Sequence, residues 1–164
     1  LFGKTPEAQR VLATAFRDRF VTKTYIAITA GRNPESGVLR HNLARHDRAR
    51  GPKMAVEPTG KPAETEFTRL AAEGGLSVVE LRPITGRTHQ LRAQLAAAGH
   101  PILGDRRYFQ AGSRSIAQRL GVERLCLHAA SLEFPHPQVG EQMRLEAPLP
   151  EALARIAARA GFRP

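Results

Sequence analysis

Short strand-like segments separated by turns are the feature that most limits how this chain can fold. In KTYIAITAG (23–31), the side chains of Tyr25, Ala27 and Thr29 share one face of an extended segment that Gly31 ends. Similar segments occur at 63–70, 76–84, 125–135 and 142–148. Because few helices lie between them, the sequence favours an α+β protein with a mixed, mainly antiparallel sheet and flanking helices over a doubly wound parallel fold.

Four helices are predicted around this sheet. The first, TPEAQRVLATAFRDRF, offers Thr5 as its N-cap, Pro6 at its first helical position and apolar residues along one face. The predicted helices cover 5–20, 88–98, 114–120 and 150–160. The segment 32–63 is rich in glycine, proline, arginine and histidine, and we predict that it is irregular and basic.

Charge and cysteine content restrict the class of partner and the compartment. The 164 residues, enough for about one domain, include 25 Lys and Arg against 15 Asp and Glu, a net charge of +10 that favours a polyanion, nucleic acid first. The single cysteine, Cys126, excludes an intramolecular disulfide and a multi-cysteine metal site. No apolar run reaches the ~18 residues of a membrane span, and no signal-peptide pattern opens the sequence. We expect a monomeric cytoplasmic protein with no membrane partner.

Common signatures of cofactor and metal chemistry are absent from the sequence. GPKMAVEPTGKP resembles a phosphate-binding loop only superficially, because Ala55 stands where glycine is required and Pro62 where a hydroxyl would hold magnesium. The six histidines never pair at the i, i+4 spacing of a helical zinc site. There is also no dinucleotide fingerprint and no nucleophile elbow. We therefore expect neither a metal nor a cofactor.

The segment ITGRTHQLRAQLAAAGHPILGD (84–105) places four polar or charged residues at the start of a predicted helix. Leu91, Leu95 and Ala98 share one helical face, and Arg92 lies at its border, partly removed from water. A cation in that position needs a carboxylate or a phosphate. Two interpretations follow: a structural acid such as Asp105 or Glu80 pairs with Arg92, or the helix start binds an anion.

The same segment, extended to RRY, resembles the third motif of the RluA-type pseudouridine synthases, which isomerise uridine in ribosomal or transfer RNA. The resemblance continues, in family order and spacing, through 23–31, 60–67 and 127–150. It implies a pseudouridine synthase-like catalytic domain whose cleft binds structured RNA and takes a flipped-out uridine. It also implies a nucleophilic carboxylate, and no metal or cofactor.

The resemblance assigns two catalytic residues. Arg92 matches the arginine that pairs with the catalytic aspartate, and Tyr25 matches the tyrosine that stacks on the uracil ring and can handle a proton. A fixed guanidinium would keep a nucleophilic aspartate ionised, and an aromatic face would replace contacts that a flipped base loses. We further expect RNA contacts from the residues Arg87, His89, Gln90, Arg45, Arg48, Arg50 and Arg107.

One family feature is missing from this sequence. Relatives carry the catalytic aspartate in an Arg-Leu-Asp, then Thr-Ser-Gly stretch just before the segment that resembles LFGKTPEAQR. Here the only aspartates are Asp18, Asp47 and Asp105, and none lies in such a stretch. We therefore expect residues 1–164 to be a catalytic domain truncated at its N-terminal side, inactive alone. Arg92 would then lack its main partner, leaving the segment poorly stable or repacked.

Three functional interpretations remain open at this point. The first is that the parent protein is an RNA pseudouridine synthase. The second is a non-catalytic RNA-binding relative without the nucleophilic aspartate. The third treats the charge of +10 as a source of solubility and of general polyanion binding, with no preference for structured RNA at moderate salt.

Overall fold

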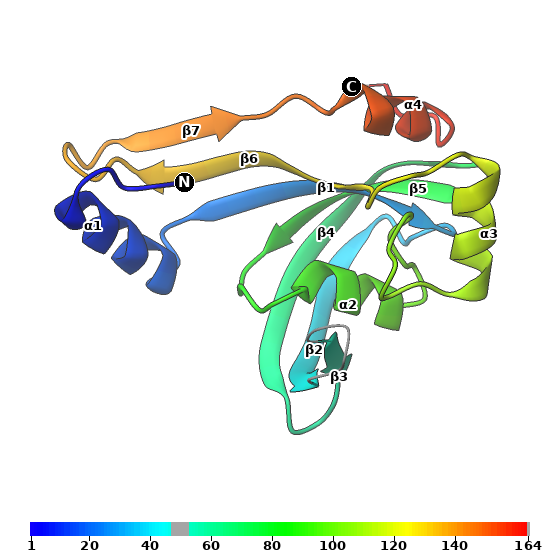
Figure 1. Ribbon diagram of the computed structural model, residues 1–164, viewed down its shortest axis with the longest axis horizontal. Coiled ribbons are helices and arrows are strands. Elements are labelled where there is room, and N and C mark those ends of the chain that lie inside the picture. The colour runs from blue at the N-terminus through cyan, green and yellow to red at the C-terminus, as the bar shows by residue number, and fades with distance from the viewer. Residues whose placement is uncertain (47–52, 164) are drawn as a thin grey trace.

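A single seven-stranded sheet forms the centre of the molecule (Figure 1). The computed structural model describes residues 1–46 and 53–163. The strands are β1 (Thr22–Ala30), β2 (Ser36–His46), β3 (Lys53–Val56), β4 (Lys61–Glu73), β5 (Leu76–Pro83), β6 (Leu127–Pro135) and β7 (Gln142–Glu146). Their spatial order is β3-β2-β4-β5-β1-β6-β7, and every pairing between these strands is antiparallel. The predicted α+β class is confirmed.

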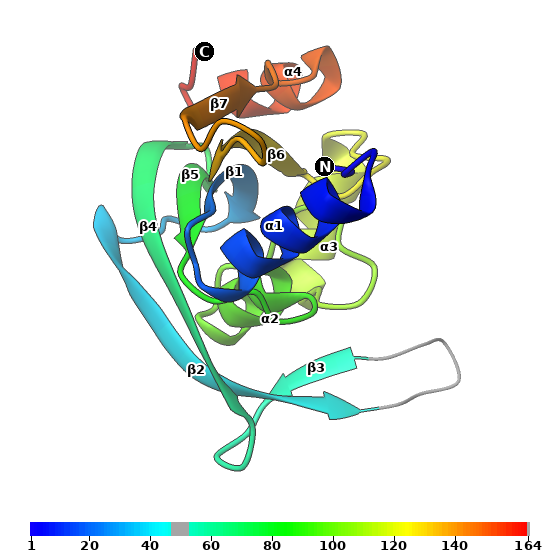
Figure 2. The same ribbon diagram turned by 90° about the vertical axis from the view of Figure 1, so that its left-hand side faces the viewer.

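Helices lie on both sides of this sheet. They are α1 (Pro6–Arg17), α2 (Gln90–Ala97), α3 (Ala111–Arg119) and α4 (Glu151–Ala158). Helices α1, α2 and α3 lie on one side and α4 on the other (Figures 1 and 2). None of the helices within the described ranges combines the length and hydrophobicity that crossing a membrane would require.

The main core is built from the central strands and the helices on both faces. Ile28 of β1 and Val78 of β5 are fully buried, in the same cluster as Leu95 of α2 and Leu153 of α4. Successive side chains of a strand point to opposite faces, and β1 and β5 both bury consecutive residues, so both faces of these strands need a covering helix.

The prediction of an irregular segment at 32–63 is wrong where β2 and β3 lie. Strand β2 pairs with β4 from Ser36 to Leu43, and an ion pair of 2.9 Å joins Arg40 of β2 to Glu64 of β4. Polar residues with low strand propensity are extended here because the neighbouring strand supplies hydrogen bonds and cross-strand contacts. No periodic apolar pattern in β2 could indicate this.

The boundaries of two helices also differ from the prediction. Helix α2 begins at Gln90, since His89 has a left-handed backbone (φ 51°), and Ala98, expected on the apolar face, is exposed. Helix α3 begins at Ala111, before the predicted start at residue 114, and the Ser113 hydroxyl accepts a hydrogen bond from the Gln110 backbone N–H at 3.0 Å at this end.

Strand β6 contains a bulge at Ala130. Thr24 of β1 pairs with Ser131, whereas the next residue, Tyr25, pairs with Ala129, so Ala130 has no partner in β1. Directly paired residues of antiparallel strands share a face. Ala129 and Leu132, which lie three residues apart, therefore project to the same face of the sheet as Tyr25.

Candidate active site

A pocket of about 360 Å³ lies where β1, the end of β5 and the start of α2 meet. It brings together two residues that the resemblance assigned to catalysis, Tyr25 and Arg92, with three predicted RNA contacts, Arg87, His89 and Gln90. Burial raises the pKa of Tyr25, so its hydroxyl is protonated at neutral pH. The other lining residues are Lys23, Pro83, Thr85, Gly86, Leu91 and Leu127.

Arg92 is paired within the chain. Its Nε and Nη2 atoms donate to the two carboxylate oxygens of Asp105 at 2.7 and 2.8 Å. The Asp105 side chain is 0% exposed and that of Arg92 17%. The alternative of a structural pair with Asp105 is confirmed, so Arg92 has an acidic partner even without the catalytic aspartate that the resemblance implies. The chain between Gly99 and Asp105 turns back onto α2, which spacing alone does not reveal.

Asp105 is held as an ionised clamp on Arg92. Besides the arginine, the backbone N–H groups of Arg107 and Tyr108 donate to its Oδ1 at 2.8 and 2.9 Å. Burial favours the neutral acid, but the hydrogen bonds from Arg92 and from these two backbone groups outweigh it and lower the pKa of Asp105. The carboxylate therefore fixes one edge of the guanidinium.

The other edge of Arg92 remains available to the pocket. Asp105 occupies Nε and one side of Nη2, which leaves the N–H groups of Nη1 and the outer N–H of Nη2. The ring of Tyr108 lies against the guanidinium, with its centroid 5.0 Å from Cζ, and limits its movement. Arg92 can thus hold a second anion without giving up its first.

His89 reaches the pocket in a defined protonation state. Burial and the positive charges of Arg92 and Arg107 lower the pKa of His89, so the ring is neutral at pH 7. The Tyr108 hydroxyl accepts a hydrogen bond from the backbone N–H of Met54 at 2.7 Å and lies 3.2 Å from His89 Nδ1. The hydroxyl proton is therefore free to point at Nδ1, an assignment that leaves the imidazole N–H on Nε2.

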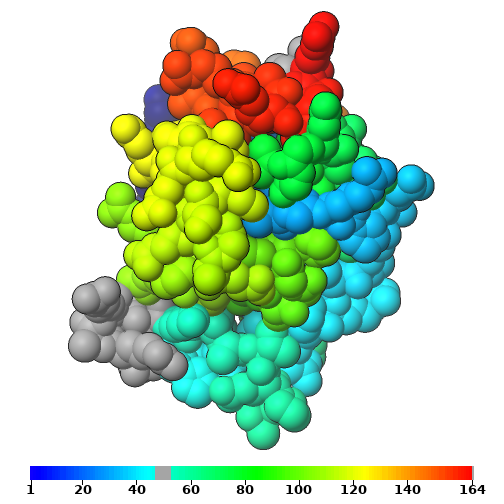
Figure 3. All heavy atoms as spheres, turned by 90° about the vertical axis from the view of Figure 1, so that its right-hand side faces the viewer, coloured from blue at the N-terminus to red at the C-terminus, as the bar shows by residue number. Residues whose placement is uncertain are grey.

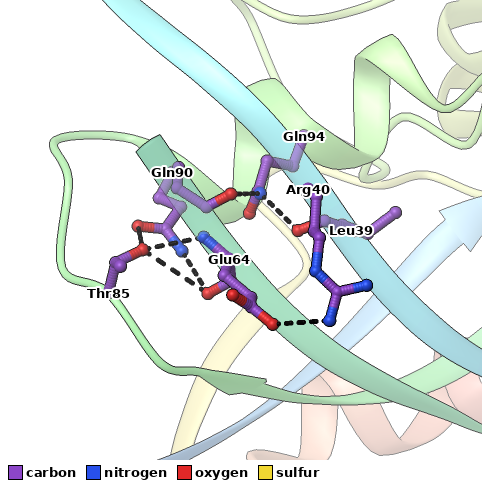
Figure 4. Close-up of polar contacts among 7 residues, drawn as sticks. Leu39, Arg40, Glu64, Thr85, Gln90 and Gln94 are labelled. Atoms are coloured by element: carbon purple, nitrogen blue, oxygen red, sulfur yellow. Dashed lines mark hydrogen bonds and ion pairs between the residues drawn. The ribbon is translucent and has the colours of Figure 1, made fainter. Parts of the chain in front are cut away.

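Gln90 has a structural role. Its Oε1 accepts from the Thr85 hydroxyl at 2.8 Å and its Nε2 donates to the Glu64 carbonyl at 2.9 Å (Figure 4). Oε1 also accepts from the Arg87 backbone N–H, and Nε2 also donates to the Thr65 hydroxyl, both at 2.9 Å. These bonds tie the loop before α2 to β4. They leave the amide no hydrogen-bonding capacity for RNA, so the geometry does not support that predicted role.

Gln94 forms the second half of this polar network. Its Nε2 donates to the carbonyl oxygen of Leu39 at 2.9 Å (Figure 4). Nε2 also donates to the Ala63 carbonyl at 3.0 Å, and Oε1 accepts from the Thr65 hydroxyl at 2.7 Å. The side chain is 0% exposed. Sequence reasoning missed this role, because a glutamine on a helix carries no signal for a buried backbone contact.

The remaining predicted contacts lie around or outside the pocket. Arg87 is exposed on the rim and donates from Nε to the Pro62 carbonyl at 3.2 Å. Arg45 lies exposed on β2, and neither it nor Arg107 lines the pocket. Arg48 and Arg50 lie outside the described residues.

Lys23 is the charged lining residue that the sequence analysis did not single out, and burial lowers its pKa. Its place beside Tyr25 on one face of β1 is the signal that could have found it. None of the residues that line the pocket is a carboxylate. Among the described residues, no group of three or more His, Cys, Asp or Glu is placed to hold a metal ion.

Solved structures share this fold. The chain superimposes on human RNA Pseudouridylate Synthase Domain Containing 1 with a TM-score of 0.74 and 31% identity, covering 88% of this chain and 61% of that one. For human RNA Pseudouridylate Synthase Domain Containing 4, the TM-score is 0.76 and the identity 27%, covering 96% of this chain and 69% of the other. The architecture is thus that of a pseudouridylate synthase domain.

The chain belongs to the RNA pseudouridylate synthase family, whose model matches residues 1–97. Among curated proteins, it is 37% identical to ribosomal large subunit pseudouridine synthase C of Salmonella typhimurium, over 94% of this chain and 50% of the relative. It is 35% identical to the protein of the same name from Haemophilus ducreyi, over 97% of this chain and 50% of that relative. The chain therefore spans about half the length of the curated relatives it matches.

Proposed function

We propose that this chain is the part of a catalytic domain that holds the target base in an enzyme converting uridine to pseudouridine in large-subunit ribosomal RNA. The observation that carries the proposal is the convergence of Tyr25 and Arg92 on one pocket. The names of the curated relatives support ribosomal rather than transfer RNA as the substrate. The net charge of +10 supports a polyanionic partner.

Three residues of the pocket can assist the conversion of uridine to pseudouridine. The bond from ribose C1′ to uracil N1 breaks, a bond from C1′ to C5 forms, and the proton on C5 leaves while N1 gains one. The free edge of Arg92 would keep an attacking carboxylate ionised. The ring of Tyr25 would stack on the detached base, and Nε2–H of His89 would donate to a uracil carbonyl oxygen.

The attacking carboxylate is the component that the described pocket does not contain. Asp18 is engaged by Arg17 at the surface, and Asp105 is buried in its pair with Arg92. Asp47 lies outside the described residues. The proposal therefore places the nucleophilic aspartate in a stretch preceding Leu1. The same observation favours the second candidate, an RNA-binding relative without catalysis.

Release of the C5 hydrogen tests the proposal directly. Large-subunit ribosomal RNA labelled with tritium at uridine C5 loses the label to water when C5 bonds to C1′. We expect the protein that includes the residues preceding Leu1 to release tritium from this RNA and not from a transfer RNA transcript. Tyr25→Phe and Arg92→Lys should each lower the single-turnover rate by about 10²–10⁴, whereas Arg144→Gln, at an exposed ion pair, should leave it unchanged.

Each alternative gives a different result in this assay. Tight binding of the structured RNA without tritium release would establish the non-catalytic reading. Equal binding of structured RNA and an unstructured polyanion at moderate salt would leave only general polyanion binding. We also propose that the protein acts as a monomer in the cytoplasm, which the buried, unpaired Cys126 supports and which sedimentation and cell fractionation test.

A further inference from the structure

A second concave surface lies between α3 and α4, and none of the residues lining the candidate active site contributes to it. Its volume is about 910 Å³. The segment after α3 forms one wall and α4 the other, and the two lie against each other in Figure 3, coloured yellow and orange to red. We call it the α3–α4 groove. Its floor includes the buried side chains of Cys126 and Leu153.

Arginines form the rim of the α3–α4 groove. They are Arg119, Arg124, Arg155 and Arg159, and all four are exposed. Glu123 is the one acidic residue that lines the groove. The rim therefore carries an excess of positive charge at every pH at which arginine is ionised.

The four rim arginines differ in their pairing from the surface arginines that the fold holds in ion pairs. Arg40, Arg82 and Arg144 each form an ion pair with a glutamate. Within residues 1–46 and 53–163, none of the four rim arginines forms an ion pair or a side-chain hydrogen bond. The positive charge of the rim is thus not neutralised by ion pairs among the described residues.

The positive surface continues around α3. An adjoining hollow of about 660 Å³ shares Val122 and Glu123 with the α3–α4 groove and adds Arg106 and Arg114. Arg114 packs its guanidinium over an aromatic ring rather than against an acid. The hollow also includes Asp105, the clamp on Arg92. The basic surface therefore runs from the groove to the rear of the candidate active site.

We infer that the α3–α4 groove binds the phosphodiester backbone of substrate RNA outside the target nucleotide. Unpaired, exposed guanidiniums on a concave rim suit phosphate oxygens, which accept bidentate hydrogen bonds. No aromatic side chain lines the groove, so it offers no platform for stacking bases. The contact therefore adds affinity irrespective of base sequence and takes no part in the chemistry. This inference rests on the proposed function, because it takes the partner to be RNA.

The test compares two double substitutions of equal charge in the full-length protein. Arg155→Gln with Arg159→Gln removes two rim charges, and Arg17→Gln with Arg144→Gln removes two charges that acids already neutralise. All four side chains are exposed, and matching melting curves will confirm folding. Dissociation constants for a ribosomal RNA fragment are then measured across a series of salt concentrations.

We expect the rim variant to bind on the order of tenfold more weakly at low salt and to lose about 2 from the slope of log K against log salt. The control should retain the slope. In the tritium assay the rim variant should raise KM and leave kcat unchanged. A slope equal to that of the control would overturn the inference, even if the enzyme is active. A reduced slope in a protein that releases no tritium would uphold the groove and refute the proposed function.

An acidic protein segment is the competing occupant of the same groove. A fluorescent polyglutamate peptide that binds the unaltered protein, loses affinity in the rim variant and fails to compete with RNA would assign the groove to a protein partner. That outcome too would overturn the inference.

Discussion

Replacing Asp105 by asparagine tests whether the buried ion pair beneath the pocket stabilises the fold. The substitution keeps Oδ1 as acceptor for the two backbone N–H groups but places an amide N–H against Arg92 Nε. Breaking a buried pair by removing one partner costs about 3–5 kcal/mol. Arg92 is 17% exposed and regains some hydration, so we expect a loss of about 2–3 kcal/mol, or about 5–10 °C in Tm.

Urea unfolding followed by circular dichroism measures this loss, with Arg144→Gln as the control. The control removes an arginine that is 60% exposed and paired with two glutamates, and it should cost no more than about 1 kcal/mol. Arg92→Leu, which leaves the Asp105 carboxylate buried without its cation, should also destabilise. A loss of under about 0.5 kcal/mol in both Asp105→Asn and Arg92→Leu would refute the reasoning.

The difference in unfolding free energy between the unaltered protein and Asp105→Asn should also depend on pH. The folded pKa of Asp105 lies below its ordinary value, about 3.9 in an unfolded chain. Its contribution to stability is therefore complete above the unfolded pKa and is lost as pH falls through the folded pKa. The gap between the unaltered protein and Asp105→Asn should be constant from pH 7 to about pH 5 and shrink below about pH 4. A gap that persists unchanged at pH 3 would contradict this linkage.

Three further predictions concern other positions. Gly104→Ala should cost at least about 2 kcal/mol in urea unfolding, because φ is +72° and a Cβ would lie 2.0 Å from a backbone oxygen; Gly112→Ala, with open space in α3, should instead be neutral or stabilise by up to about 1 kcal/mol. Tyr108→Phe should cost about 1–2 kcal/mol and release His89 from a single tautomer, which ¹⁵N NMR of the ring reports; an unchanged mixture of tautomers would contradict the hydrogen-bond assignment. Burial raises the pKa of Cys126 to about 11, so an aromatic disulfide reagent at pH 8 should label the native thiol at least about a hundredfold more slowly than the urea-unfolded one, and equal rates would contradict its burial.

Local chemistry made some elements predictable. Thr5 caps α1 as expected, its hydroxyl accepting from the Ala8 N–H at 3.2 Å. The strand around Tyr25 was evident from alternation and a terminal glycine. In both cases the signal lies within a few neighbouring residues, and the tertiary structure agrees with it.

Other features depend on contacts between distant segments. Strand β2 exists because β4 lies beside it, and the Arg92 partner is fixed by how the chain returns after α2. From the sequence, Asp105 and Glu80 were both possible partners of Arg92, and only the folded structure shows that Asp105 is the partner. Gln90 was predicted to contact RNA, but its side-chain amide is hydrogen-bonded to Thr85 and to the backbone of β4. The sequence could not show that these groups of the fold would occupy it.

The bulge at Ala130 sets the phase of strand β6. Before it, odd-numbered residues such as Leu127 face the candidate active site; after it, even-numbered residues such as Leu132 and Phe134 face α1 and its cluster. One unpaired alanine thus lets a single strand line the pocket at one end and hold a helix at the other. Deleting that residue would remove the bulge and still leave Leu127, Leu132 and Phe134 on one face, whereas inserting a second residue there would turn one half of the strand to the opposite face; β6 should therefore tolerate a deletion at position 130 far better than an insertion.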